Sequence, residues 1–216
     1  MNQQKMNPPG KAVSPKIIGL YFGSFNPVHI GHLVIANYMV EYAELDELWF
    51  IVSPQNPHKQ KASLLNDHDR LELVQLAIEG DSRFRVSDIE FSLPKPSYTI
   101  ETLTYLKKRH PGLFFKILMG SDNLENFHKW KNYKIIVDDF GVIVYPRPEF
   151  DASQIKQHKN IQIASEAPLM EISSSFIREG LKEGRDMRHF LPPKVWALID
   201  KKGFYRSFPG EPSLAQ

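Results

Sequence analysis

One stretch decides how this chain folds: IIGLYFGSFNPVHIGHL, from Ile17 to Leu33. Its opening apolar run, residues 17–22, predicts a buried strand, and Gly23 and Ser24 end that run. A helix is expected next, because apolar residues recur on one helical face at Leu33, Ala36, Val40 and Ala43. In α/β proteins such a turn is a place for nucleotide phosphates, because free backbone N–H groups and the positive helix end point at the ligand.

Two histidines lie inside this turn, His29 and His32. Three residues apart at the start of a helix, they would face the same way, and Gly31 between them would let a ligand approach the backbone. Imidazoles can donate hydrogen bonds to phosphate oxygens while charge develops in a transition state. Two other interpretations stay open: the pair could satisfy helix-end groups, or it could form half of a metal site in a chain without cysteine.

The motif Gly23-Ser-Phe-Asn-Pro-x-His-x-Gly-His32 resembles the signature of the nucleotidyltransferase superfamily that carries His-x-Gly-His. The chain has neither a P-loop motif nor Gly-x-Gly-x-x-Gly, which leaves this turn as its phosphate-binding candidate. The motif differs in two places from the form in nicotinate-nucleotide adenylyltransferases: Phe22 replaces a glycine and Asn26 replaces an aspartate. The resemblance implies that the turn contacts ATP through Gly23, Ser24, Phe25, His29 and His32.

Composition indicates one globular domain. The chain has 216 residues, 42% hydrophobic content and a formal net charge of +2, so neither nucleic acid nor a membrane surface is expected as a partner. The absence of cysteine suits a reducing compartment, and we expect a cytoplasmic protein with no membrane span. We expect a disordered lead-in over residues 1–15, a single domain over 16–206 and a loose tail over 207–216.

Buried runs alternate with helical segments along the whole chain. Strands are expected at residues 17–22, 47–53, 84–88, 114–119, 140–145 and 161–164. A helix over 67–80 would have Asp67 as its N-cap and Gly80 as its stop. This alternation predicts an α/β fold: a doubly wound, mostly parallel sheet of the Rossmann-like nucleotidyltransferase type, with a small helical C-terminal part.

Two stretches in the middle of the chain point to an acceptor site. The loop 54–65 follows the second strand, and by resemblance to nicotinate-nucleotide adenylyltransferases His58 and Lys59 would contact the acceptor's phosphate. Pro96-Ser-Tyr-Thr99 matches a stretch that in this family meets the carboxylate of nicotinate, which implies a role for Tyr98 and Thr99. Ser97 and Thr99 could equally be helix caps.

Further ligand residues are implied after the fourth strand. Gly120 and Asp122 match the family's Gly-x-Asp, where the carboxylate would accept bonds from ribose hydroxyls, although Asp122 could also be an N-cap. Trp130 matches the tryptophan on which the pyridinium ring stacks, although most tryptophans belong to a core. The backbone of Lys131 would then also lie near the carboxylate.

The stretch Ile172-Ser-Ser-Ser-Phe-Ile-Arg178 resembles the second motif of the superfamily. Its serines can cap a helix, and they can also leave N–H groups free for a triphosphate. Arg178 follows Ser175 by one helical turn, and its planar fork suits phosphate oxygens.

Together these motifs imply a nicotinate-nucleotide adenylyltransferase, which joins ATP and nicotinate mononucleotide into deamido-NAD and pyrophosphate by direct in-line attack. His29, His32 and Arg178 would be catalytic, and Mg²⁺ would be carried by the ATP phosphates, with no metal held by a protein cage. Three alternatives remain. The protein could be a pantetheine-phosphate adenylyltransferase, it could be an adenylyltransferase that accepts nicotinamide mononucleotide, or it could be a catalytically silent nucleotide-binding module. The oligomeric state is left open, and a homo-oligomer is compatible with the sequence.

Overall fold

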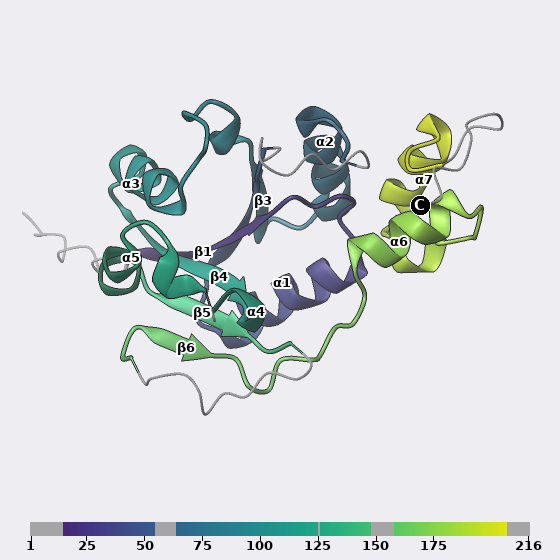
Figure 1. The fold of residues 1–216 in the computed structure, drawn as a ribbon. Helices are drawn as coiled ribbons and strands as arrows, with labels where there is room; N and C mark the ends of the chain where they lie inside the picture. Colours follow the sequence, from purple (N-terminus) through teal and green to yellow (C-terminus); the bar gives the residue numbers. More distant parts are fainter. Residues whose placement is uncertain (1–14, 55–63, 125, 148–157, 207–216) are drawn as a thin grey trace, which may run out of the picture.

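The computed structural model describes residues 15–54, 64–124, 126–147 and 158–206. Its centre is a six-stranded parallel sheet in the order β3-β2-β1-β4-β5-β6 (Figure 1). The strands are β1 (Lys16–Gly23), β2 (Glu47–Val52), β3 (Phe84–Ser87), β4 (Leu113–Gly120), β5 (Val142–Tyr145) and β6 (Ile161–Ile163). The predicted fold class and strand positions are confirmed, because each strand overlaps the apolar run that predicted it.

Helices lie between the consecutive strands from β1 to β5, and two more helices follow β6. They are α1 (Ile30–Tyr42), α2 (Asp67–Ile78), α3 (Thr99–Arg109), α4 (Ser121–Leu124), α5 (Tyr133–Asp139), α6 (Ser174–Lys182) and α7 (Pro193–Lys202), with short 3-10 turns η1 (Ile89–Phe91), η2 (Phe127–Lys129) and η4 (Arg188–Phe190). None of the helices in the described part of the chain is long and apolar enough to cross a membrane.

Side chains on the two faces of the sheet form two separate cores. On one face, β1 contributes Ile18 and Leu20, which pack with apolar residues of α3 and α5. On the other face Tyr21 packs with residues of α1, α2, α6 and α7. Because successive residues of a strand point to opposite faces, the continuous apolar runs of the sequence reflect burial on both sides.

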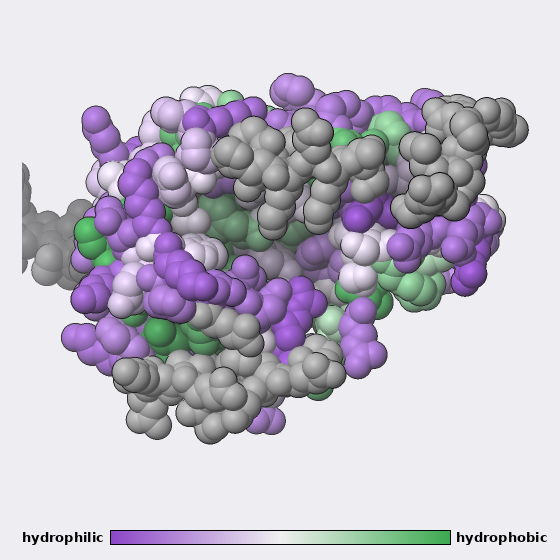
Figure 2. Space-filling view, in the orientation of Figure 1, coloured by the Kyte–Doolittle hydropathy of each residue, from purple (hydrophilic) through white to green (hydrophobic). Residues whose placement is uncertain are grey.

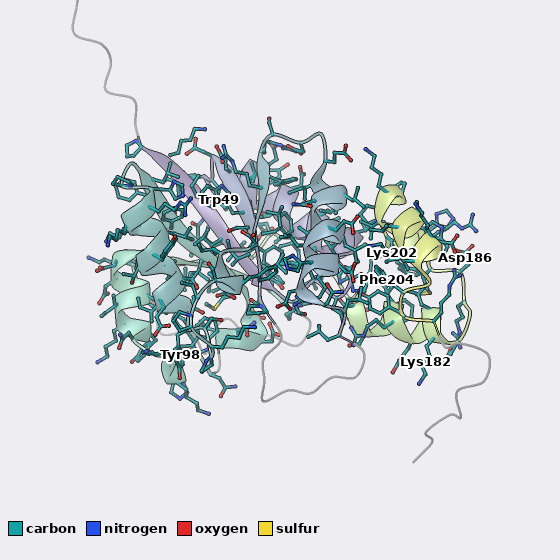
Figure 3. The ribbon with its side chains drawn as sticks, turned by 90° about the horizontal axis from the view of Figure 1, so that it is seen from above. Trp49, Tyr98, Lys182, Asp186, Lys202 and Phe204 are labelled. Carbon is teal, nitrogen blue, oxygen red and sulfur yellow. The ribbon has the colours of Figure 1, made fainter. Side chains whose placement is uncertain are left out.

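The C-terminal part lies beside the sheet rather than within it. Helix α7 contacts α2, and α6 and α7 extend to the right in Figure 1. Seen from above, Lys182, Asp186, Lys202 and Phe204 lie together at one end of the molecule, and Tyr98 lies toward the other end (Figure 3). The predicted helical C-terminal part is therefore present.

One local prediction is wrong, and one helix was not expected. The N-cap of α2 is Asn66, whose side chain accepts a hydrogen bond from the backbone N–H of Asp69, whereas Asp67 lies inside the helix and pairs with Arg70. Helix α1 buries Gly31, Ile35, Ala36 and Met39, and the predicted face packs on the same core, with Ala43 buried and Leu33 and Val40 half-buried. Helix α5 was not expected, and it ends before Gly141, whose φ of +84° favours glycine.

The turn between β1 and α1 is tied to distant segments through its own carbonyls. Arg70, which is fully buried, donates hydrogen bonds to the carbonyl oxygens of Ser24, Ser53 and Leu65. Its guanidinium therefore joins the ends of β1 and β2 to the start of α2. A single charged group thus satisfies backbone acceptors from three segments that meet at the carboxyl edge of the sheet.

Replacing Arg70 with Ala should lower the free energy of unfolding by about 3–5 kcal/mol, because the carbonyls and Asp67 lose their buried partner. Urea unfolding followed by circular dichroism measures the change. Arg185→Ala is the matched control, since that side chain is 70% exposed and pairs with the exposed Glu183 at the surface. The control should cost no more than about 1 kcal/mol. Equal losses for the two variants would contradict the role given to Arg70.

Candidate active site

A pocket of about 450 Å³ opens at the carboxyl edge of the sheet. It is visible as the hollow at the centre of Figure 2, where apolar surface lies inside a polar rim. Residues from both predicted ligand regions line it: Gly23, Ser24, Phe25, His32, Thr99, Gly120 and Trp130. This is the position at which open α/β sheets bind ligands, because parallel strands end there together and the turns that follow them converge.

His29 and His32 lie face to face at the amino end of α1. Their ring centroids are 3.8 Å apart, and His29 is the N-cap of the helix. An ideal Cβ on Gly31 would lie 3.0 Å from Nδ1 of His29. The glycine therefore leaves room for the His29 ring itself, rather than for a ligand as the sequence suggested.

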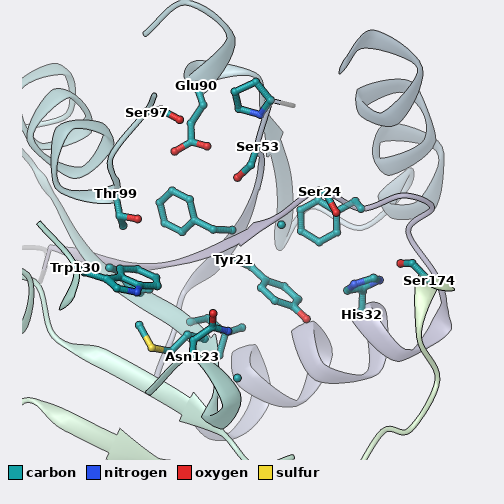
Figure 4. A pocket seen from close by; sticks show the side chains of 18 of the residues that line it. Tyr21, Ser24, His32, Ser53, Glu90, Ser97, Thr99, Asn123, Trp130 and Ser174 are labelled. Atoms are coloured by element: carbon teal, nitrogen blue, oxygen red, sulfur yellow. The ribbon is translucent and has the colours of Figure 1, made fainter. Parts of the chain in front are cut away.

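The hydrogen bond between the histidines determines which nitrogen of His32 carries the proton. The backbone N–H of His29 donates to Nδ1 of His32 over 3.2 Å. Nδ1 is therefore an acceptor, and in the neutral ring the proton is on Nε2. His32 lines the pocket, so this arrangement provides a neutral N–H donor at its wall (Figure 4).

Burial makes both imidazoles weak bases. Loss of solvation, with a smaller contribution from the positive charge of Arg147, lowers the pKa of His29 to about 4. The pKa of His32 is also well below its ordinary value, because of burial first and then of the charges of His29 and Arg147. Both rings are therefore neutral at pH 7 in the free protein, and a bound polyanion would raise both pKa values.

Arg178 and the serines before it reach the turn from α6. Arg178 donates to the backbone carbonyl of Asn26 over 2.8 Å and to Oγ of Ser175 over 3.1 Å. Ser174 donates to the carbonyl of Pro27 and lines the pocket, whereas Ser173 caps the helix through the N–H of Phe176. The second motif therefore supports the histidine turn from outside, and its serine at the pocket wall is Ser174 rather than Ser175.

The opposite end of the pocket is formed by α3 and η2. Thr99 and Trp130 line it, together with Ser97 (Figure 4). Tyr98 is the N-cap of α3 but makes no side-chain capping bond, and neither Ser97 nor Thr99 takes that role. The capping interpretation is therefore wrong, and the first N–H groups of α3 have no side-chain cap.

Tyr98 and Lys131 are engaged with each other outside the pocket. Nζ of Lys131 lies 4.3 Å from the centroid of the Tyr98 ring and 2.6 Å from Oε1 of Glu101. Neither side chain lines the pocket. Any contact of these two residues with an acceptor is therefore a backbone contact.

Asp122 lies on α4 just past the end of β4, and Oδ1 is 3.8 Å from Nε of Arg147. A side chain on Gly120 would collide with this carboxylate, which explains the glycine there. Arg147 also donates to the hydroxyl of Tyr145 over 3.0 Å. It is a functional candidate that the sequence analysis missed, and the signal available was its place directly after β5.

Other pocket residues were also missed, because no motif assigned them a ligand role: Tyr21, Phe22, Ser53, Glu90, Asn123 and Tyr145. His58 and Lys59 lie outside the described residues. Within the part of the chain that the structure describes, no three His, Asp or Glu side chains are grouped to hold a metal ion.

Known proteins share both the sequence and the fold. A family model described as cytidylyltransferase-like matches residues 20–180. A Flavobacterium johnsoniae protein named probable nicotinate-nucleotide adenylyltransferase is 49% identical over 191 residues, which cover 88% of this chain and 98% of that protein. A Bacteroides fragilis protein of the same name is 51% identical over 181 residues, 84% of this chain and 90% of that protein. The chain belongs to the nicotinate-nucleotide adenylyltransferase family.

A solved member of this nucleotidyltransferase family has the same fold. Plasmodium falciparum nicotinic acid mononucleotide adenylyltransferase, in complex with NaAD, superposes with a TM-score of 0.75 at 24% identity, over 88% of this chain and 97% of that one. In the present structure, the side chain of Asn26 accepts hydrogen bonds from the N–H of Leu65 and the hydroxyl of Tyr205. The oxygen of an aspartate could accept the same two hydrogen bonds. The asparagine that replaces the family's usual aspartate therefore holds the turn in the same way.

The lowered pKa of His29 predicts how stability depends on pH. Between pH 4 and 6.5 the unfolded chain binds more protons than the folded one, so the free energy of unfolding rises with pH in this window. Acidification from pH 7 to pH 5 should cost roughly 2 kcal/mol through His29 alone.

Urea unfolding of the protein and of His29→Asn at both pH values measures this contribution. The substitution should flatten the pH dependence by that amount, because asparagine does not titrate. The same slope in both proteins would contradict a buried, neutral His29.

Proposed function

We propose that the protein transfers the adenylyl group of ATP to nicotinate mononucleotide, forming deamido-NAD and pyrophosphate in NAD biosynthesis. The observation that carries the proposal is one pocket with two chemically different ends. His32 and Arg147 border one end, and Trp130 with the amino end of α3 borders the other. The names of the relatives support the same reaction.

The histidine end suits the triphosphate of ATP. His32 can donate from Nε2 to a phosphate oxygen, and Arg147 supplies positive charge beside it. In the free protein Arg178 donates to the backbone carbonyl of Asn26 and keeps the turn in place. When ATP binds, its guanidinium would leave that carbonyl and bind the β and γ phosphates together with the amide of Ser175. Gly120 and Asp122 lie where ribose hydroxyls of the nucleotide would be bound.

The Trp130 end suits a flat cation that carries a carboxylate. The face of an indole attracts a pyridinium ring, and the uncapped N–H groups at the start of α3 can bind the carboxylate of nicotinate. Backbone groups of Tyr98, Thr99 and Lys131 would make these contacts. His58 and Lys59 remain the candidates for the acceptor's phosphate, by family resemblance.

The reaction needs no covalent intermediate and no general base, because the attacking phosphate oxygen of the acceptor is already anionic. That oxygen forms a bond to the α-phosphorus of ATP while the bond to the β-phosphate oxygen breaks in line. The protein holds the two phosphates in position and stabilises charge on the leaving pyrophosphate. Magnesium would be carried by triphosphate oxygens, as it usually is in such sites.

Replacing His32 with Ala should lower kcat by on the order of a hundredfold or more, as for loss of one oxyanion donor. Pyrophosphate release from Mg-ATP and nicotinate mononucleotide measures this. His189→Ala is the control, because that histidine is exposed on η4 and does not line the pocket. Turnover of His32→Ala within a few-fold of the control would remove His32 from the mechanism.

Replacing Trp130 with Ala should raise KM for the acceptor by about tenfold, because cation–π stacking contributes about 1–2 kcal/mol. KM for ATP should change little, since Trp130 lies at the other end of the pocket. An acceptor KM equal to that of the unmodified protein would contradict the stacking role.

The decisive assay compares nicotinate mononucleotide, nicotinamide mononucleotide and phosphopantetheine as acceptors, one at a time. A strong preference for the first supports both the reaction and the carboxylate site. Equal use of the two mononucleotides would keep the reaction and reject the carboxylate site. Activity with phosphopantetheine alone would contradict the proposed function, and so would a lack of activity with all three acceptors.

A further inference from the structure

Glu90 is a buried acid in the pocket wall to which the reaction described so far gives no role. It lies on η1 directly after β3, and only 4% of its surface is exposed. Figure 4 shows its carboxylate between the side chains of Ser97 and Ser53, directed toward the cavity.

The partners of this carboxylate are neutral hydroxyls. Thr102, itself fully buried on α3, donates to Oε1 over 2.9 Å, and the side chain of Ser53 at the end of β2 also donates to Glu90. Among the described residues, no Lys, Arg or His nitrogen forms an ion pair with Glu90 (Lys95 of the same pocket is exposed). Burial accordingly raises the pKa of the carboxyl group.

A purely structural link between Ser53 and Thr102 would not need a charge. A glutamine has the same shape, and its amide oxygen accepts the same hydroxyl donors. A carboxylate in this position carries a desolvation penalty that no hydroxyl donor fully offsets when no cation compensates it. An acid that is buried, faces a ligand cavity and has no cation beside it among the described residues is explained when the ligand supplies the positive charge.

We propose that Glu90 is a specificity-determining residue that provides the counter-charge for the cationic pyridinium ring of the acceptor. The inference rests on the proposed function, and it adds a negative charge to the aromatic surfaces of Trp130 and Phe22 in the same pocket. Aromatic faces combined with a carboxylate favour a flat cation over a neutral ring of equal shape. The site therefore selects the oxidised mononucleotide against its 1,4-dihydro form, whose ring is neutral.

The experiment compares nicotinate mononucleotide with its 1,4-dihydro form in the unmodified protein and in Glu90→Gln. These two ligands share carboxylate, ribose and phosphate and differ in the charge of the ring. In the variant, kcat/KM for the cationic acceptor should fall about tenfold, the equivalent of one pK unit of charge interaction. The value for the neutral acceptor and KM for ATP should stay within about twofold.

Thr102→Val is the matched control, because it removes the hydroxyl bonded to Glu90 and keeps the carboxylate. It should leave the ratio of the two acceptors within about twofold of the original, since the charge remains. A fall in both acceptors by the same factor in Glu90→Gln, or an equal change of the ratio in Thr102→Val, would overturn the proposal in favour of a structural role.

Calorimetric binding of both mononucleotides separates this inference from the proposed reaction. Absence of turnover by the unmodified protein contradicts the proposed function, while tighter binding of the cationic form that is lost in Glu90→Gln still supports the counter-charge. If Glu90→Gln does not fold, equal affinity of the unmodified protein for the two forms overturns the inference, and a clear preference for the cation supports it.

Discussion

The structure depends on how the turn between β1 and α1 is held. Its carbonyls at Ser24, Asn26 and Pro27 accept hydrogen bonds from Arg70, Arg178 and Ser174, which come from α2 and α6. Tyr205, after α7, also reaches the turn through the side chain of Asn26. Because these bonds hold the turn from outside, the two histidines are already positioned before a substrate binds. The C-terminal helices, which add no strand to the sheet, thus serve the active site.

Burial then gives the site its electrostatic character. His29 and His32 are neutral because they are desolvated, and the guanidinium of Arg147 lowers their pKa values further. At the other end Glu90 lacks a cation within the described part of the chain, and the start of α3 lacks a side-chain cap. Each end of the pocket is therefore complementary to one charged part of the two proposed substrates. This arrangement raises the cost of folding and lowers the reorganisation needed in the reaction.

Sequence reasoning predicted the sheet because all six strands are apolar runs separated by turn signals. It found His32, Thr99 and Trp130 because each belongs to a motif, and these residues do line one pocket. It missed Glu90 and Arg147, which are single residues after strand ends that only tertiary contacts bring to the pocket. The contacts of Ser175, Tyr98 and Lys131 with substrate were assigned to backbone groups and stay predictions, because the side chains of these residues do not line the pocket.

The central claim is that His29 and His32 are desolvated and neutral in the free protein and bind the phosphates of ATP. NMR titration of the protein with ¹³C-labelled histidine, with and without a non-hydrolysable Mg-ATP analogue, tests it most directly. The free protein should show one imidazole that titrates near pH 4 and a second also well below the usual range, and the analogue should raise both pKa values. Signals assigned to His29 and His32 by substitution that titrate near 6.5 in the free protein, or that do not respond to the analogue, would contradict the account.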